Sequence, residues 1–358
     1  MSARRILRKK VILCVGAGGV GKTTVAASIA VASALRGRRT AVITVDPARR
    51  LKDTLGLGEL STHPRAVALA GAQEAGSLHA FALDAKHTFD ALVERFAGSA
   101  AAAQRILDNR LYQELSTSLA GSAEYMAMEK LHHLVTHERY DTVVVDTPPS
   151  AHARDLLGAP NRLLDLLATR AVSLLRSPGS LLSGTGSLAR VTLSTLLKAL
   201  ERWTGMNLLS DLSEFTAAFE HMMEGFADRA RQVETLLHSP STAFVLVTTP
   251  ETHTVATTVE FHHELCEAGY PVAGVIANRV LAFPELDAEA LAGNGWPERL
   301  RQRLLANYED LRRLSRRDER MLARLQTEAD APLLAAIPLL TELPVSVVQL
   351  RRFAQYLS

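Results

Sequence analysis

One short stretch constrains the fold of this chain more than any other feature. Residues 16–24 read Gly-Ala-Gly-Gly-Val-Gly-Lys-Thr-Thr. Gly16, Gly21, Lys22 and Thr23 match the spacing G-x-x-x-x-G-K-[ST] of a phosphate-binding loop. Glycines allow backbone N–H groups to curl around phosphate oxygens, and a helix that begins there adds partial positive charge. The stretch therefore predicts a site for the phosphates of a nucleotide.

The sequence on either side supplies the strand and the helix that this motif needs. The apolar run Val11–Val15 predicts a buried strand, and the alanine-rich residues after the loop predict a helix from Thr23 to about Leu35. In that setting Lys22 reaches the β- and γ-phosphates, and the Thr23 hydroxyl binds Mg²⁺. An ordinary strand–turn–helix with glycines for close packing is the alternative, which this context disfavours. The other residues expected to contact nucleotide are Ala17, Gly18, Gly19, Val20 and Thr24.

Composition narrows the class of protein. The 358 residues allow two or three domains, or one nucleotide-binding core with a large insertion, and 47% hydrophobic residues support a sizeable core. The net charge of +2 gives no indication of a nucleic-acid partner, and we expect none. We expect a solvated lead-in to the first strand from the basic residues Arg4, Arg5, Arg8, Lys9 and Lys10.

Cysteine usage and hydropathy also exclude several kinds of protein. Cys14 and Cys266 belong to no CxxC pair, so the sequence predicts neither a zinc cage nor a disulfide framework. No run of ~18 uncharged apolar residues appears, which predicts no transmembrane helix. The N-terminus lacks the pattern of a signal peptide. We therefore expect a cytoplasmic protein.

Two further strands are followed by carboxylates. Thr40–Val45 predicts a buried strand that leads into Asp46, and Thr142–Asp146 predicts another that ends in one. Carboxylates after buried strands lie at the edge where open α/β sheets bind ligands. An apolar strand ending in Asp is the Walker B pattern, whose carboxylate helps to organise the Mg²⁺ shell. Asp46 before a proline is equally typical of a helix cap.

The remaining elements complete an α/β pattern. Further strands are expected at Leu78–Asp84, Ala243–Thr248, Val272–Ala277 and Leu333–Ile337, and helices at 85–140, 161–238, about 297–327 and 345–357, the third of them on the surface. Strands that alternate with helices predict a doubly wound, mostly parallel sheet. We expect an ATPase core of residues 1–84, 141–160 and 242–358, with an α-helical subdomain of residues 85–140 and 161–241 inserted in it.

Residues 161–238 carry a dense apolar set interrupted by glycine-rich breaks at 177–187. The simpler interpretation is a helical core. The functional interpretation is an apolar groove for a client protein, because methionine-rich surfaces repack around varied partners. The candidate groove residues are Phe219, Met222, Met223 and Phe226.

Taken together, these segments resemble the ArsA family of P-loop ATPases, which includes arsenite-pump ATPases and ATPases that target tail-anchored membrane proteins. The segments that carry the likeness are 16–24, 46–53, 121–124, 146–152, and Asn278 with Pro338-Leu339. Their order and spacing match from about residue 10 to 158 and again from about 242 to 357. Asp-Pro-Ala after the second strand, combined with Asp-Thr-x-Pro-[Ser/Thr]-x-His after the Walker B strand, is specific to this family.

The resemblance implies a P-loop NTPase of the deviant Walker A type, with ATP or ADP and Mg²⁺ as cofactors and two protomers acting face to face as a homodimer. Asp46 would orient the attacking water, and Asp146 would act on Mg²⁺ through water. Asn278, Pro338 and Leu339 would hold the adenine. The residues implied in the two switch segments are Pro47, Arg49, Arg50 and Asp53 in the first and Thr147, Pro149 and His152 in the second.

This chain departs from the family pattern at several positions. Ala17 stands where the family has a signature lysine that crosses the dimer interface, and Arg49 or Arg50 could supply a substitute charge. Gly293–Trp296 lies where the tail-anchor targeting ATPases carry a zinc CxxC, so no zinc is expected. The arsenite-binding cysteine cluster is missing too. Three functions stay open: a carrier of a hydrophobic client or membrane-associated partner, an arsenite-type pump ATPase, and a regulator of another assembly.

Overall fold

The computed structural model describes residues 3–45, 50–69, 76–109, 112–113, 122–149, 153–155, 157–160, 225, 227–281, 283, 296–342 and 344–357. It divides into two compact units. The first, called here the sheet unit, comprises residues 1–82, 134–153 and 237–358. The second, called here the helical unit, comprises residues 83–133 and 154–236.

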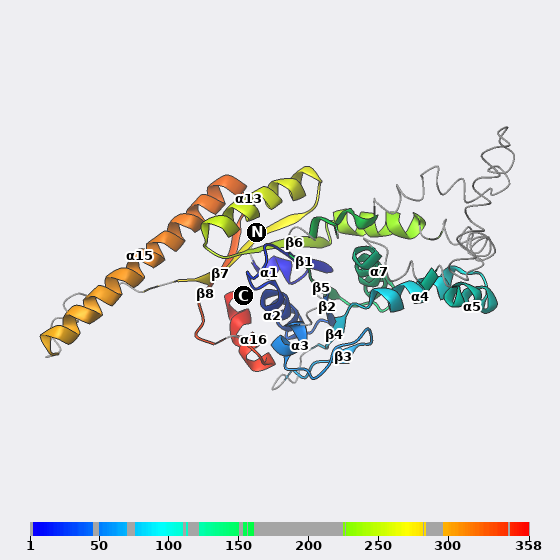
Figure 1. Ribbon diagram of the computed structural model, residues 1–358, viewed down its shortest axis with the longest axis horizontal. Coiled ribbons are helices and arrows are strands. Elements are labelled where there is room, and N and C mark those ends of the chain that lie inside the picture. Colours follow the sequence, from blue (N-terminus) through cyan, green and yellow to red (C-terminus); the bar gives the residue numbers. More distant parts are fainter. Residues whose placement is uncertain are drawn as a thin grey trace, which may run out of the picture. The chain divides into compact units, whose positions relative to one another are not determined.

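An eight-stranded sheet forms the centre of the sheet unit, in the order β3-β4-β2-β5-β1-β6-β7-β8 (Figure 1). Every neighbouring pair is parallel except β3 with β4. Strands β1, β2, β5 and β6 are buried along their whole length, as expected when helices cover both faces of a parallel sheet. The strands are β1 Val11–Val15, β2 Thr40–Thr44, β3 Arg65–Ala66, β4 Leu78–Ala82, β5 Thr142–Asp146, β6 Thr242–Thr248, β7 Val272–Val280 and β8 Leu333–Pro338.

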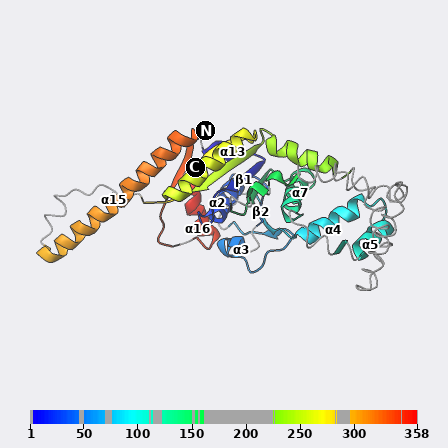
Figure 2. The ribbon, with the colours of Figure 1, turned by 45° about the horizontal axis from the view of Figure 1, so that its top comes forward.

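Helices cover the sheet from both sides. Helices α2, α3 and α16 lie together on one face, and α13 packs with α15 on the other (Figures 1 and 2). The helices of this unit are α1 Ala3–Ile6, α2 Lys22–Ala34, α3 Arg50–Leu55, α13 Thr252–Glu267, α15 Glu298–Ala329 and α16 Val347–Ala354, with a 3₁₀ turn at Gln355–Leu357. The predicted fold class, a doubly wound and mostly parallel α/β sheet, is confirmed.

The structure corrects the sequence expectations in three places. β7 continues through Asn278 to Val280, whereas the predicted strand ended at residue 277. β4 ends at Ala82, and Asp84, predicted to close that strand, instead accepts a hydrogen bond from the His87 backbone N–H at 3.0 Å as the cap of the next helix. Its short carboxylate side chain is among the preferred N-caps.

The third correction concerns the charged helix predicted on the surface. One face of α15 is buried, and its residues are Ser315, Asp318, Leu322, Leu325 and Ala329. They recur every three or four positions, which is the spacing of a helix face that packs against a neighbour. That neighbour is α13, and Figure 1 shows α15 extending well beyond it.

The described part of the helical unit consists of helices around a small apolar core. Helices α4 Ala85–Phe96, α5 Ala100–Asp108 and the first part of α7, whose bounds are Ser122–Thr136, belong to it, together with helical residues from 227 on. Val93, Ile106 and Met126 are among its buried side chains. The stretch 161–224, which includes three of the predicted groove residues, lies outside the described residues, as does Phe226.

Candidate functional site

The loop between β1 and α2 has the glycine geometry that its sequence predicts. Gly19 and Gly21 have φ values of 78° and 93°, in the left-handed region that favours glycine. A Cβ on Gly16 would lie 2.2 Å from the carbonyl oxygen of Val247, and one on Gly21 would lie 2.3 Å from Nδ2 of Asn278. A larger residue at 16 would therefore clash with the β6 backbone, and one at 21 would clash with the Asn278 side chain.

Lys22 lies inside the curve of this loop. Its Nζ donates hydrogen bonds to the carbonyl oxygens of Gly16 at 3.1 Å and Ala17 at 2.8 Å, and the residue is only 7% exposed. A buried ammonium held among backbone groups at a helix N-terminus is a site for a phosphate oxygen. Ala17 is partly buried and packs against the core of the sheet unit.

Asn278 supports the loop from β7. Its Nδ2 donates to the carbonyl oxygen of Val20 at 2.8 Å, and its Oδ1 accepts from the backbone N–H of Arg279 at 3.0 Å. The amide is buried and both of its ends are engaged. The structure therefore gives Asn278 a part in holding the phosphate loop. Its role toward adenine stays a prediction.

The Walker B carboxylate lies at the same edge of the sheet. Asp146 is the last residue of β5 and is paired in register with Cys14 of β1 and Thr44 of β2. It is 1% exposed, and its Oδ2 accepts a hydrogen bond from the Thr44 hydroxyl at 3.1 Å. This contact fixes the orientation of the carboxylate.

Thr44 was not among the predicted site residues. The run Thr-Ala-Val-Ile-Thr predicts a buried strand, and a buried hydroxyl needs a hydrogen-bond partner. That need was the sequence signal for Thr44.

Charge near the loop acts on Cys14. Burial raises the pKa of its thiol well above the usual range, the Asp146 carboxylate raises that pKa further, and the Lys22 ammonium opposes the increase. The thiol is therefore protonated at neutral pH. It behaves as a small apolar core residue rather than as a nucleophile or a metal ligand.

The second switch segment begins beside this carboxylate. Thr147 donates its hydroxyl to the carbonyl oxygen of Cys14 at 2.7 Å, which ties the segment to the end of β1. Pro149 lies beside the loop, since a Cβ on Gly18 would be 3.9 Å from two of its side-chain atoms. His152 lies outside the described residues.

The remaining predicted residues are only partly described. Asp46, Pro47 and Arg49 lie outside the described residues, whereas Arg50 and Asp53 are exposed on α3. Pro338 is the last residue of β8, and the neighbouring Leu339 side chain is 56% exposed. The Leu339 backbone N–H donates to the carbonyl oxygen of Val280 at 2.9 Å, which holds this turn beside β7.

The donors present fit a nucleotide with Mg²⁺. Thr23 in the first turn of α2 and Asp146 at the end of β5 offer a hydroxyl and a carboxylate oxygen at the carboxyl edge of the sheet. Mg²⁺ prefers a few such oxygen ligands together with phosphate oxygens and water. Within the described ranges, no group of three or more His, Cys, Asp or Glu side chains forms a metal cage.

A parallel α/β sheet with this loop, its lysine and a Walker B carboxylate at the carboxyl edge defines a P-loop nucleotide-binding protein. The family profile described as anion-transporting ATPase, ArsA ATPase, matches residues 9–310. The chain therefore belongs to the ArsA ATPase family, which confirms the resemblance seen in the sequence.

Individual relatives are distant. The chain is 27% identical to ATPase GET3 of Kluyveromyces lactis over 76% of this chain and 72% of that protein. It is 26% identical to an ATPase ASNA1 homolog of Trypanosoma cruzi over 96% of this chain and 89% of that protein. Identity to ATPase ASNA1 homolog 1 of Paramecium tetraurelia is 30% over 41% of this chain, and the match spans 42% of that relative's length.

No helix in the described part of the chain is both long and apolar enough to cross a membrane.

Proposed function

We propose that this protein binds and hydrolyses ATP with Mg²⁺. The observation that carries the proposal is the position of Lys22, buried within a glycine loop whose neighbouring strand β5 ends in the fixed carboxylate of Asp146. The loop N–H groups and Lys22 would neutralise the charge of the phosphates. Thr23 and Asp146 would hold Mg²⁺, which supplies charge stabilisation at the transferred phosphoryl group.

Asp46 completes the proposal as the group that orients the attacking water. It follows β2, whose Thr44 is paired in register with Asp146, so the chain enters this segment next to the Walker B carboxylate. Replacement of this carboxylate by an amide keeps the size of the side chain but weakens its ability to accept a proton from water.

Steady-state ATP hydrolysis by three variants tests the proposal. Lys22→Ala should lose nucleotide binding or reduce turnover by roughly 100-fold, because the phosphate charge is left uncompensated. Asp46→Asn should bind ATP but hydrolyse it poorly. Lys86→Ala, which removes an exposed lysine from α4, is the matched control and should behave as wild type. Wild-type turnover by Asp46→Asn would contradict the role given to that residue.

We further propose that ATP closes a homodimer whose helical units handle a hydrophobic client, such as a segment of a membrane protein. Support comes from the family and from the apolar content of residues 161–238. A model apolar helix should bind more tightly with a non-hydrolysable ATP analogue than with ADP, because ATP favours one state of the equilibrium. Changing Met222 and Met223 to Ser should remove that difference. Binding unaffected by nucleotide or by both changes would favour a plain helical core.

Arsenite is the competing substrate, and the described cysteines do not favour it. Cys14 is buried in β1 and Cys266 is exposed on α13. We expect arsenite to leave ATP hydrolysis unchanged. Stimulation that survives replacement of both cysteines by Ser would show a site that thiol chemistry does not explain.

A further inference from the structure

A second cationic pocket lies at the sheet edge opposite the phosphate loop. Its residues come from the segments that precede three adjacent parallel strands: Lys10 before β1, Arg38 before β2, and Tyr140 with Asp141 before β5. These strands are neighbours in the order β2-β5-β1, so their amino ends bring the segments together. The ATP phosphates would bind at the opposite, carboxyl ends of the same strands.

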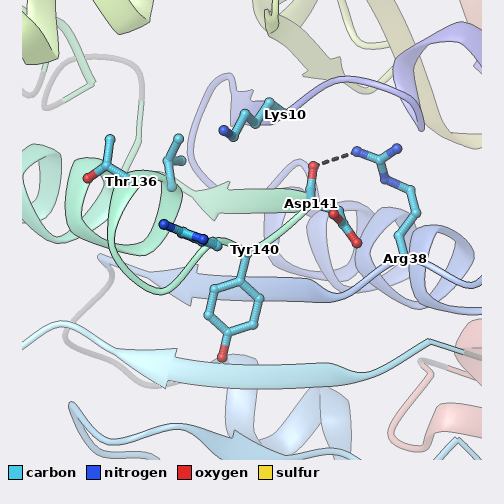
Figure 3. A pocket seen from close by; sticks show the side chains of 7 residues that line it. Lys10, Arg38, Thr136, Tyr140 and Asp141 are labelled. Atoms are coloured by element: carbon cyan, nitrogen blue, oxygen red, sulfur yellow. Dashed lines mark hydrogen bonds between the residues drawn. The ribbon is translucent and has the colours of Figure 1, made fainter.

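The pocket is open and has a volume of about 660 Å³. Figure 3 shows Lys10, Arg38 and Asp141 around it, with the Arg38–Asp141 hydrogen bond drawn as a dashed line. The end of α7 contributes Val135 and Thr136 to one side of the pocket, and the Thr136 hydroxyl lies 2.7 Å from His137 Nδ1. The full lining is Lys10, Arg38, Val135, Thr136, Arg139, Tyr140 and Asp141.

Positive charge in this pocket exceeds its negative charge. The lining includes three cations and one carboxylate, that of Asp141. That carboxylate accepts a hydrogen bond from the backbone N–H of Arg39 at 2.8 Å, while Arg38 donates to the Asp141 carbonyl oxygen and to Thr142 Oγ1. Asp141 therefore serves to join the strand ends and does not form an ion pair with Lys10 or Arg139.

Two cations remain available to a ligand. Among the described residues, neither the Lys10 ammonium nor the Arg139 guanidinium has a hydrogen-bond or ion-pair partner. Arg139 also has a φ of 54°, a backbone conformation in which glycine would be less strained. The arginine at this position places a guanidinium beside the pocket, although its backbone conformation is strained for a non-glycine residue.

The surroundings add to the positive potential. The Arg39 guanidinium lies 4.5 Å from the centre of the Tyr140 ring, and its Nη1 donates to the Glu138 carbonyl oxygen at 2.7 Å. Its charge helps to lower the pKa of nearby His79, although burial is the larger cause. Glu138 is the other acidic residue in this turn. The region therefore contains four cations and two carboxylates.

We propose that this pocket binds a phosphoryl group at a site separate from the phosphate loop. Arginine and lysine together suit phosphate, because a guanidinium offers paired N–H donors and an ammonium offers a compact charge. The inference does not depend on ATP hydrolysis. The group could belong to a free phosphorylated compound or to the headgroup of an anionic lipid, since both present the same oxygens.

Calorimetric titration with inorganic pyrophosphate tests the site, with Lys22→Ala as the background so that the phosphate loop does not dominate binding. Lys10→Gln combined with Arg139→Gln should weaken the remaining affinity roughly tenfold or more, because two charge-assisted contacts are lost. Arg299→Gln combined with Arg303→Gln removes the same charge from exposed positions of α15 and should have no effect. Affinity should fall with salt, because the screening length is only about 8 Å at physiological ionic strength.

Vesicle sedimentation separates the two sources of phosphate. Binding to phosphatidylcholine vesicles that contain phosphatidylglycerol, lost in the Lys10/Arg139 variant and retained in the Arg299/Arg303 variant, would assign the site to lipid headgroups. Pyrophosphate binding without vesicle binding would assign it to a free phosphorylated compound. The proposal is overturned if the two double variants behave alike in both assays. ATP turnover measured with Lys22 intact should be unchanged in both, which separates this result from the test of hydrolysis.

Discussion

At the scale of single residues, Asn278 has one contact that the structure describes and one that the sequence resemblance implies. Its amide nitrogen holds the Val20 carbonyl of the loop, and the resemblance gives it a contact to adenine. The two roles predict different losses. Asn278→Ala should weaken binding of both ATP and inorganic tripolyphosphate, because the Val20 carbonyl oxygen loses its hydrogen bond from Asn278, and an unsatisfied buried acceptor costs about 1–3 kcal/mol.

Leu339→Ala provides the comparison, since Leu339 is exposed at the turn implied to hold adenine. It should weaken ATP binding and leave tripolyphosphate binding unchanged. Fluorescence competition or calorimetry gives both affinities. If Asn278→Ala weakened only ATP, its contact to Val20 would have no importance for the phosphate site.

Cysteine reactivity provides a second test at this scale. Burial raises the pKa of both thiols, but Cys14 lies within β1 whereas Cys266 is exposed on α13. One equivalent of a maleimide should react with the folded protein at neutral pH, and a second only after denaturation. Cys266→Ser should abolish the first reaction. Rapid labelling of folded Cys266→Ser would show that β1 opens readily.

At the scale of elements, α15 has one buried face, whereas its charged sequence predicted only that it lies on the surface. Leu325 is 1% exposed, while Leu314 on the same helix is 42% exposed. Leu325→Ala should destabilise the sheet unit by about 2–5 kcal/mol, because a buried side chain leaves a cavity. Leu314→Ala should change stability by no more than about 0.5 kcal/mol. Urea unfolding followed by circular dichroism measures both, and equal losses would contradict the packing of α15 against α13.

The sequence predicted elements best where a short-range pattern determines them. The strands β1, β2 and β5 and the helix after the loop were located almost to the residue, because apolar runs and the glycine motif depend only on neighbours along the chain. The buried face of α15 was missed because its Asp318 reads as a surface charge. In the fold Asp318 is 2% exposed, with its Oδ2 accepting from the Leu281 backbone N–H at 3.0 Å.

The same limit applies to the site. Lys22 and Asp146 carry motifs and could be named from the sequence, whereas the contacts from Thr44 to Asp146 and from Asn278 to Val20 join residues far apart in the sequence. Such pairs depend on strand order and register, which no local pattern contains. Asp46 and the Met222–Met223 pair stay predictions.

At the scale of the whole molecule, the two units need not share one stability, because each has its own core. The helical unit contains a buried ion pair that joins α7 to the helical residues from 227 on. Glu129 of α7 lies 3.0 Å from Arg229, from its Oε1 to the arginine Nε, and both side chains are almost fully buried. Arg229 Nη1 also donates to His132 Nδ1 at 2.8 Å, so that nitrogen of His132 carries no proton in this arrangement.

We expect this cluster to make the stability of the helical unit depend on pH. Burial raises the pKa of Glu129 from its ordinary 4.5 to about 7, although Arg229 acts in the opposite direction. Among the residues that the structure describes, none forms a hydrogen bond to its Oε2, so the ionised form is incompletely compensated. A carboxyl whose pKa is higher in the folded state than in the unfolded state binds its proton more tightly when folded. Its contribution to stability is therefore complete below about pH 4.5 and is lost as the pH rises through about 7.

The predicted loss in the helical unit between these two pH values is on the order of 3 kcal/mol. Hydrogen exchange of the α7 amides measures this loss. Their protection factors, corrected for the intrinsic exchange rate at each pH, should fall as the pH rises. Glu129→Gln keeps the shape but cannot ionise, so its protection should be nearly flat over this range, while amides of β1 and β6 in the sheet unit should respond alike in both proteins. An equal slope in wild type and Glu129→Gln would mean that Glu129 ionises normally and that its pair with Arg229 fully compensates its burial.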